Sequence, residues 1–265
     1  MNSLRDNRQY LLPSGLALAI AGVLASPILY AQEANITELD AIEVSADAAE
    51  PSGTAPSDGY TAEATVTGTK TTTNVVETPQ SISTVTADQI EDQNAANLGE
   101  VLRYTAGARG ETFGFEPRTT FLRIRGFDVA TSGLFRDNLK LANPGFAAGY
   151  SLEPYGAERI DVLKGPSSVL YGQAGPGGLV NYVSKRPTFD TRREVRVEAG
   201  TNDLVQGHFD ISGAVNDSDT LAVRLVGLVR DSETQVDFVN DDRKYLAPSL
   251  TWQPTDATRL TVLAP

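Results

Sequence analysis

The chain has 265 residues, with 22 Lys and Arg against 34 Asp and Glu, a net charge of −12, one His and no Cys. Such an acidic chain lacks the basic face that nucleic acid needs against its phosphates. The lack of Cys excludes disulfides, thiolate zinc sites and a Cys nucleophile, and one His leaves little for a His-based hydrolase. Composition therefore favours a function other than catalysis.

Residues 1–31 have the features of a secretory signal peptide. Arg5 and Arg8 precede an apolar stretch that runs only from Gly15 to Ala25. A membrane-spanning helix needs about 20 apolar residues, so this stretch is too short for an anchor. We predict cleavage after Ala31 and export of the mature chain to the bacterial periplasm or outer membrane.

Residues 32–59 form a predicted flexible leader, because Ala, Glu, Ser, Pro and Gly dominate a segment with little apolar surface to bury. One piece of it, Leu39–Ser45, alternates apolar and polar residues. That pattern is typical of a strand that pairs with another protein by strand addition. On its pattern alone, the piece is better explained as an amphipathic linker.

Residues 60–187 are predicted to form a compact α+β domain. Capping-box spacing predicts helices that begin after Thr86 and after Asn97, the second ending at Gly107. β-Branched and alternating runs predict four strands, over 81–85, 121–127, 160–163 and 179–183.

The Gly-rich stretch 165–178 raises the question of phosphate binding. Neither of the two glycine spacings that cradle a phosphate at the start of a helix occurs in it. Its two Gly-Pro pairs also interrupt any helix that could direct its N-terminus at an anion. We therefore predict a tight, packed turn system.

After Pro187 the apolar period becomes two and stays there, which predicts an antiparallel meander of about five strands over 188–265. Val223 and Leu225, for example, share one face, and Arg224 lies on the other. In an exported chain, strands of about ten residues are typical of an outer-membrane barrel, but periodicity fits half of a soluble β-sandwich equally well. His208 lies on a polar face, where we interpret it as a solvated side chain rather than a ligand.

Several long motifs resemble those of the TonB-dependent siderophore receptors of the bacterial outer membrane, and are most similar to the ferrichrome and other hydroxamate-type members. In chain order they are Glu77–Ser83, Val101–Gly107, Arg123–Phe127, Tyr155–Ile160, Leu163–Gly172, Gly175–Asn181 and Ser184–Pro187. The resemblance implies an α+β plug domain followed by the first antiparallel strands of a 22-stranded outer-membrane β-barrel. With room for about five strands, the barrel is incomplete in this chain. We expect an N-terminal fragment that cannot transport alone.

The resemblance also implies roles for parts of the chain. The leader segment corresponds to the TonB box, the strand that TonB of the inner-membrane energy-transducing complex captures in the periplasm; its residues are Leu39, Asp40, Ala41, Ile42, Glu43, Val44 and Ser45. Arg125 and Lys164 correspond to family positions that hold the plug to the barrel wall through glutamates. The family usually has Arg at the second position, and Lys lacks its bidentate fork, so this contact is expected to be looser.

The function implied is uptake of a ferric siderophore, without covalent chemistry and driven through TonB. Candidate siderophore-binding residues are Arg109, Phe113, Phe115, Arg118, Phe146 and Tyr150, the first four in a predicted apical segment, 109–118. Guanidinium and aromatic groups suit an oxygen-rich chelate whose iron is already ligated, so no metal ligand and no cofactor is expected. Ordinary exposed loop residues would have the same composition.

The expected partners are a ferric siderophore, TonB and outer-membrane lipid, with no nucleic acid. One rival interpretation is a periplasmic plug-like module that docks TonB without transport, although its last strands would then need polar or capped edges. Another is an exported glycan hydrolase, which needs a pair of converging carboxylates. The acidic residues are scattered among turns, and no pair stands out.

Overall fold

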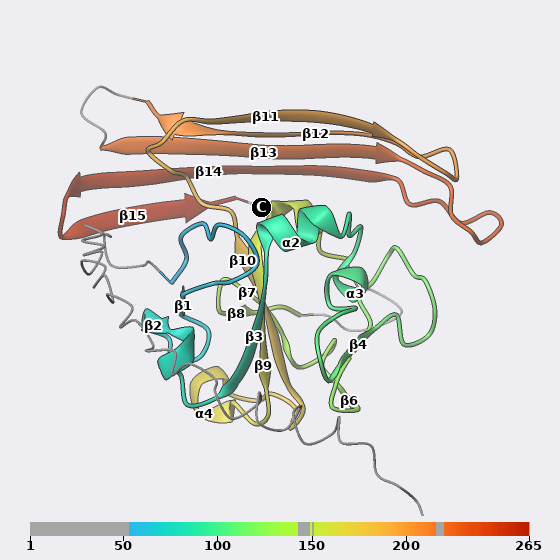
Figure 1. The fold of residues 1–265 in the computed structure, drawn as a ribbon, viewed down its shortest axis with the longest axis horizontal. Helices are drawn as coiled ribbons and strands as arrows, with labels where there is room; N and C mark the ends of the chain where they lie inside the picture. Colours follow the sequence, from blue (N-terminus) through green and yellow to red (C-terminus); the bar gives the residue numbers. More distant parts are fainter. Residues whose placement is uncertain (1–52, 143–148, 150, 216–219, 265) are drawn as a thin grey trace, which may run out of the picture. The chain divides into compact units, whose positions relative to one another are not determined.

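The computed structural model describes residues 53–142, 149, 151–215 and 220–264 (Figure 1). All described residues belong to one compact unit, Ala48–Pro265. The predicted signal peptide and the segment Leu39–Ser45 lie outside the described residues. Within the described ranges, no helix is both long and apolar enough to cross a membrane.

A five-stranded mixed sheet forms the centre of the α+β domain (Figure 1). In spatial order its strands are β3 (Ser81–Thr86), β9 (Ala157–Lys164), β10 (Gly178–Ser184), β7 (Leu134–Arg136) and β8 (Leu139–Lys140). Strands β10 and β7 are parallel, and the other pairs are antiparallel. Both central strands, β9 and β10, are buried along nearly their whole length. Both faces of these strands are covered, so that polar residues within them, such as Asp161 and Asn181, are buried together with the apolar ones. The sequence-based prediction of strands there is confirmed.

Shorter elements surround this sheet. The strands are β1 (Ala64–Thr65), paired with β2 (Thr73–Asn74), and the three-stranded set β4 (Ala108–Gly110), β5 (Leu122–Ile124) and β6 (Phe127–Asp128). The helices are η1 (Val75–Glu77), α2 (Ala87–Asp92), α3 (Leu98–Val101), η2 (Pro154–Gly156) and α4 (Ser168–Tyr171). The main core cluster packs Ile90 of α2 and Leu98 and Val101 of α3 with apolar residues of β9 and β10.

Both predicted helix starts are confirmed by their caps. The Thr86 hydroxyl accepts a hydrogen bond from the Gln89 N–H at 3.4 Å, and the Asn97 side chain accepts one from the Glu100 N–H at 3.0 Å. These side chains satisfy backbone donors that the first helical turn leaves unpaired. The predicted end of the second helix is wrong, since α3 stops at Val101 and not near Gly107.

The single strand predicted over 121–127 is also wrong. The backbone turns at Arg125 and Gly126, whose φ angles are +52° and +86°, and β5 and β6 form an antiparallel hairpin with Ile124 opposite Phe127. Two consecutive positive φ angles are what a two-residue hairpin turn of the favoured twist requires. Alternation of apolar and polar residues alone does not reveal such a turn.

The Gly-rich stretch 165–178 is a compact turn system, as predicted, but it contains one helical turn, α4, that was not predicted. The Gly165 N–H donates to the Gly177 carbonyl at 2.9 Å, which closes the base of the stretch. Ser167, at the start of α4, makes no capping hydrogen bond.

Five strands follow the α+β domain and pair with their sequence neighbours as an antiparallel meander, drawn in orange and red in Figure 1. They are β11 (Arg192–Ala199), β12 (Val205–Ala214), β13 (Leu221–Asp231), β14 (Arg243–Thr255) and β15 (Thr258–Leu263). We call this the β11–β15 sheet.

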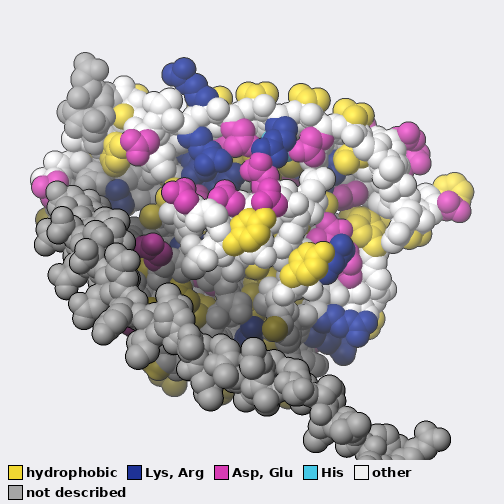
Figure 2. All heavy atoms as spheres, in the orientation of Figure 1, with side chains coloured by type: hydrophobic (Ala, Val, Ile, Leu, Met, Phe, Trp, Pro, Cys, Tyr) yellow, Lys and Arg dark blue, Asp and Glu magenta, His cyan; other side chains and the backbone are white. Residues whose placement is uncertain are grey.

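The β11–β15 sheet has the opposite polarity to that of a soluble domain. Its buried face carries polar and charged residues, including Gln206, His208, Asp210, Ser212, Arg224 and Arg230. Its exposed face carries apolar residues, including Val195, Val197, Val205, Ile211, Val223, Leu225, Val229, Leu246, Leu250, Trp252, Leu260 and Val262. Figure 2 shows acidic and basic side chains gathered in a band beneath the strands. His208 is 6% exposed, so its interpretation as a solvated side chain was wrong, because the polar face of this sheet is the covered one.

Candidate functional site

The apical segment, 109–118, brings arginine and aromatic side chains together at the surface. Arg109 on β4 lies opposite Arg123 on β5, and both are exposed. Phe113 is 64% exposed; its ring meets that of Phe121 edge to face, with centroids 5.2 Å apart. The Arg123 guanidinium lies 5.9 Å from the Phe113 centroid. This surface can offer both charge-assisted hydrogen bonds and ring faces to a ligand.

Arg123 and Phe121 were missed as candidate residues in the sequence. Their signal was the alternation of 121–124, which places Phe121 and Arg123 on one face and the buried Leu122 and Ile124 on the other. The β4–β5 pairing that places Arg123 beside Arg109 joins segments 14 residues apart and leaves no such local pattern.

Arg118 is held by its own neighbour. Its Nε and one terminal nitrogen donate to the two carboxylate oxygens of Glu116 at 2.7 and 2.6 Å. The hydrogen bonds from Arg118 lower the pKa of Glu116. Arg118 would have to release this carboxylate before it could bind a ligand. Of the predicted residues that the structure describes, Arg109 and Phe113 both lie exposed beside Arg123.

A cavity of about 580 Å³ lies between the α+β domain and the buried face of the β11–β15 sheet. Phe115 of the apical segment lines it, together with Glu91 of α2, His208 of β12 and Arg230 of β13. The predicted siderophore-binding residues thus lie in two places: Phe115 lines the cavity, whereas Arg109 and Phe113 lie at the surface. Phe146 and Tyr150 lie outside the described residues.

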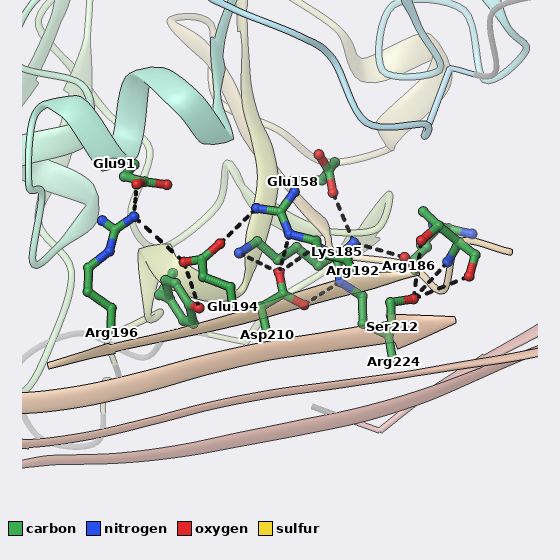
Figure 3. A network of polar contacts seen from close by, with 12 residues as sticks. Glu91, Glu158, Lys185, Arg186, Arg192, Glu194, Arg196, Asp210, Ser212 and Arg224 are labelled. Carbon is green, nitrogen blue, oxygen red and sulfur yellow. Dashed lines mark hydrogen bonds and ion pairs between the residues drawn. The ribbon is translucent and has the colours of Figure 1, made fainter. Parts of the chain in front are cut away.

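Asp210 of β12 is the centre of a buried charge network that ties the sheet to the α+β domain (Figure 3). It accepts two hydrogen bonds from Arg224 of β13, at 2.8 and 2.6 Å, and lies 3.1 Å from the Lys185 ammonium. Arg224 also reaches Glu158 of β9 at 3.3 Å and donates to the Arg186 carbonyl at 2.9 Å. Removing one member of such a buried set costs about 3–5 kcal/mol, because it leaves a buried charge unpaired.

Two further contacts extend this interface. Arg196 of β11 pairs with Glu91 of α2 (Figure 3). The Lys185 ammonium lies over the Tyr155 ring, 4.1 Å from the ring centroid. The centroids of the Tyr155 and His208 rings are 4.4 Å apart. Burial lowers the pKa of Lys185, although Asp210 favours its charged form. Ion pairs and ring contacts therefore join the β11–β15 sheet to the domain.

Arg125 and Lys164 lie near each other. The Lys164 ammonium donates to the Ser83 hydroxyl at 2.9 Å, and burial together with the Arg125 charge lowers the Lys164 pKa. Across the described ranges, neither side chain forms an ion pair. Within the same ranges, no cluster of three His, Asp or Glu side chains could hold a metal ion.

Comparisons with known proteins fit this geometry. The family model described as the TonB-dependent receptor plug domain matches residues 74–179. The ferrioxamine receptor of Yersinia enterocolitica is 38% identical over 253 residues, which cover 95% of this chain and 35% of that protein. The ferrichrome outer-membrane transporter and phage receptor of Escherichia coli K12 is 38% identical over 254 residues, covering 94% of this chain and 34% of that protein.

Solved structures agree with the sequence matches. The pyoverdine outer-membrane receptor of Pseudomonas aeruginosa, bound to pyoverdine, superposes with a TM-score of 0.72 at 27% identity, over 79% of this chain and 30% of that one. The chain thus spans about a third of the length of the relatives it matches. Together these matches place the chain in the family of TonB-dependent siderophore receptors, to whose N-terminal part it corresponds.

Proposed function

We propose that the chain is the plug and first barrel strands of an outer-membrane receptor for TonB-coupled uptake of ferric siderophores. The observation that carries this is the polarity of the β11–β15 sheet, charged toward the plug domain and apolar on its exposed face. Barrel strands in a bilayer need this arrangement, since their outer face meets hydrocarbon and their inner face does not. In the complete receptor, 22 strands would close around the plug, as the family resemblance implies.

The alternative, a periplasmic plug-like module that docks TonB without transport, is less compatible with this sheet. Such a module would expose Val223, Leu225, Leu246 and Leu250 to water on one continuous face. Large exposed apolar patches mark a surface that meets lipid or another protein. Outer-membrane lipid is the partner that this face fits best, after export directed by residues 1–31.

The ligand we propose is a ferric siderophore, and the names of the relatives make ferrioxamine- and ferrichrome-type chelates the first to test. Arg109, Phe113 and Phe115 would contact it, with Arg123 and Phe121 added from the structure. Arg118, Phe146 and Tyr150 remain candidates. The chelate fills the coordination sphere of its iron, so the protein would supply hydrogen bonds and ring contacts, without a cofactor or a catalytic step.

A transport assay tests the proposal. The chain, joined after Leu263 to the part of the E. coli ferrichrome transporter that follows its matched region, would be produced in a strain without its own hydroxamate receptors. We expect uptake of radioactive iron supplied as ferrichrome, and loss of that uptake in a TonB-deleted strain. A hybrid that reaches the outer membrane and transports equally well without TonB would contradict the proposal.

Capture by TonB is proposed for Leu39–Ser45. Replacing Ile42 or Val44 with Pro is expected to abolish binding of the TonB C-terminal domain, because Pro removes a backbone donor that strand addition needs. Ala49→Pro, in the same leader but outside the segment, is the matched control. Equal affinities of wild type and Ile42→Pro in a titration would remove this segment from the mechanism.

A further inference from the structure

Arg243, the first residue of β14, makes contacts with three separate segments of the chain. Its terminal nitrogens donate to the carbonyl oxygens of Ser151 and Pro117, both at 3.1 Å. Its guanidinium also lies 3.7 Å from the Glu153 carboxylate and 3.5 Å from that of Asp241. The side chain is 14% exposed, so these contacts are largely shielded from water.

The three segments differ in their place in the fold. Pro117 belongs to the apical segment, two residues from the cavity-lining Phe115. Ser151 and Glu153 lead into η2, where the Glu153 carboxylate accepts a hydrogen bond from the Tyr155 N–H. Asp241 lies between β13 and β14. The guanidinium of Arg243, a residue of the β11–β15 sheet, therefore binds two segments of the plug domain, at Pro117 and at Ser151.

The chemistry of these contacts requires arginine. A guanidinium presents five donors in a fixed plane, whereas the ammonium of lysine is a compact charge on a flexible stem. Two of the acceptors are backbone carbonyls, whose positions depend on the path of the chain rather than on a side-chain rotamer. A donor that bonds both carbonyls therefore sets the distance between the two segments.

We propose that Arg243 is a positioning residue for the ligand-binding surface. It fixes the apical segment against the 151–153 segment and so sets where Phe115 lies at the cavity, without touching the ligand itself. The expected effect on siderophore affinity rests on the proposed function. The structural part of the proposal, the immobilisation of the two segments, does not depend on that function.

Arg230 of β13 is a matched control. It lies 3.6 Å from the same Glu153 carboxylate and 3.0 Å from Asp241, and its side chain is 5% exposed. Its Nε donates to the Gln206 side chain at 2.9 Å. Its contacts among the described residues are therefore to side chains, so it shares the charge cluster but not the grip on the backbone.

The experiment uses the chain purified in detergent, whose micelle covers the apolar face of the β11–β15 sheet. Backbone hydrogen exchange is compared for wild type, Arg243→Lys and Arg230→Lys. We expect Arg243→Lys to speed exchange about tenfold at amides of 111–118 and 151–153, with β9 and β10 unchanged. Arg230→Lys should leave 111–118 at the wild-type rate.

Equilibrium dialysis gives the second measurement; it uses the hybrid with the remaining ferrichrome transporter strands, carrying the same substitutions, with ferrioxamine B and ferrichrome loaded with radioactive iron. We expect Arg243→Lys to weaken binding of the ferric chelate about tenfold. Its melting temperature should be close to that of Arg230→Lys. Unchanged exchange at 111–118 in Arg243→Lys, or equally fast exchange at 111–118 in both variants, would overturn the proposal. So would freed segments with undiminished affinity. If wild type binds neither chelate, the proposed function fails, and exchange alone decides whether Arg243 holds the segments.

Discussion

Asp161 is a fully buried carboxylate whose two oxygens are both engaged. The hydroxyls of Thr65 and Thr67 donate to one oxygen at 2.7 and 2.6 Å, and the Thr84 hydroxyl donates to the other at 3.0 Å. The Arg159 guanidinium, itself 1% exposed, lies 3.5 Å away. One side chain thus joins the start of the described plug to β3 and β9.

We predict that Asp161→Ala destabilises the chain by about 3–5 kcal/mol, because it leaves the Arg159 charge buried and unpaired. Asp161→Asn keeps an acceptor for the threonines and should cost less. Urea unfolding followed by pulse proteolysis measures both, with the exposed Asp190→Ala as a control expected within about 0.5 kcal/mol of wild type. An Asp161→Ala variant as stable as that control would show that this network contributes little.

Glu153 makes the stability of the plug depend on pH. Burial raises the pKa of Glu153 above its usual 4.5, although Arg230 and Arg243 favour the charged form. The folded chain therefore binds this proton more tightly than the unfolded chain does. Stability should fall as pH rises from about 4.5 through the raised native pKa, and this contribution should be constant above it.

Comparison with Glu153→Gln isolates this effect from the other acids. We predict that the unfolding free energy of the variant, relative to wild type, increases as pH rises through that window. The slope is diagnostic, because the offset also includes the lost pairing with the two arginines. A relative stability that decreases with pH would mean that the arginines outweigh burial and lower the Glu153 pKa.

The sequence predicted which residues of the β11–β15 strands share a face, but it did not predict which face is buried. Alternation placed Arg224 and Arg230 opposite Val223 and Leu225, and the structure confirms this division. It did not reveal that the polar face is the covered one, so His208 was misjudged. A period of two is the same whether a strand faces water or lipid, and only the partner of each face decides which residues are buried.

At the scale of elements, strands with continuous or alternating apolar residues were predictable, and hairpins with left-handed turns were not. The β7–β8 hairpin was missed, although Asp137 and Asn138 have φ angles of +48° and +66° in its turn. An Asp-Asn pair favours such a turn only weakly compared with one that contains Gly. The strands on either side, of three and two residues, are also too short to show a period.

Gly178, at the start of β10, allows β9 and β10 to approach each other. Its φ is +134°, and a Cβ there would lie 2.1 Å from the Leu163 carbonyl oxygen. Gly178→Ala should therefore cost about 2–5 kcal/mol, from backbone strain and from the displaced strand. Gly172→Ala, at a φ of +68° and a ψ of −138° with nothing within 4 Å of its Cβ, should cost about 1–3 kcal/mol, from backbone strain alone. Equal losses for the two variants in urea unfolding would contradict the steric argument.

For the whole molecule, the order of the β11–β15 strands followed from their short connections, whereas their attachment to the plug did not. The Arg243 contact with Pro117 joins residues 126 apart, and the Arg224 contact with Glu158 joins residues 66 apart. Contacts over such separations leave no periodic trace in one sequence. The charged residues that make them were visible only as members of a polar face.

The β11–β15 sheet has two edge strands, β11 and β15, and this limits what the 265-residue chain does when produced by itself. Hydrocarbon offers no partner for a strand edge, so each unpaired N–H or C=O costs several kcal/mol there. About five such groups per edge would cost tens of kcal/mol, against the roughly 5–15 kcal/mol that stabilises a whole domain.

We therefore predict that the 265-residue chain alone does not restore ferric hydroxamate uptake to a receptor-deleted strain, whereas its hybrid with the remaining ferrichrome transporter strands does. The chain alone should accumulate as periplasmic aggregate or be degraded, because its open edges can pair with other copies. Uptake of radioactive iron and a heat-modifiable band in the outer-membrane fraction are the two measurements, and a strain with an empty vector sets the background. Uptake by the chain alone above that background would mean that its edges are closed by other copies or by a separate protein.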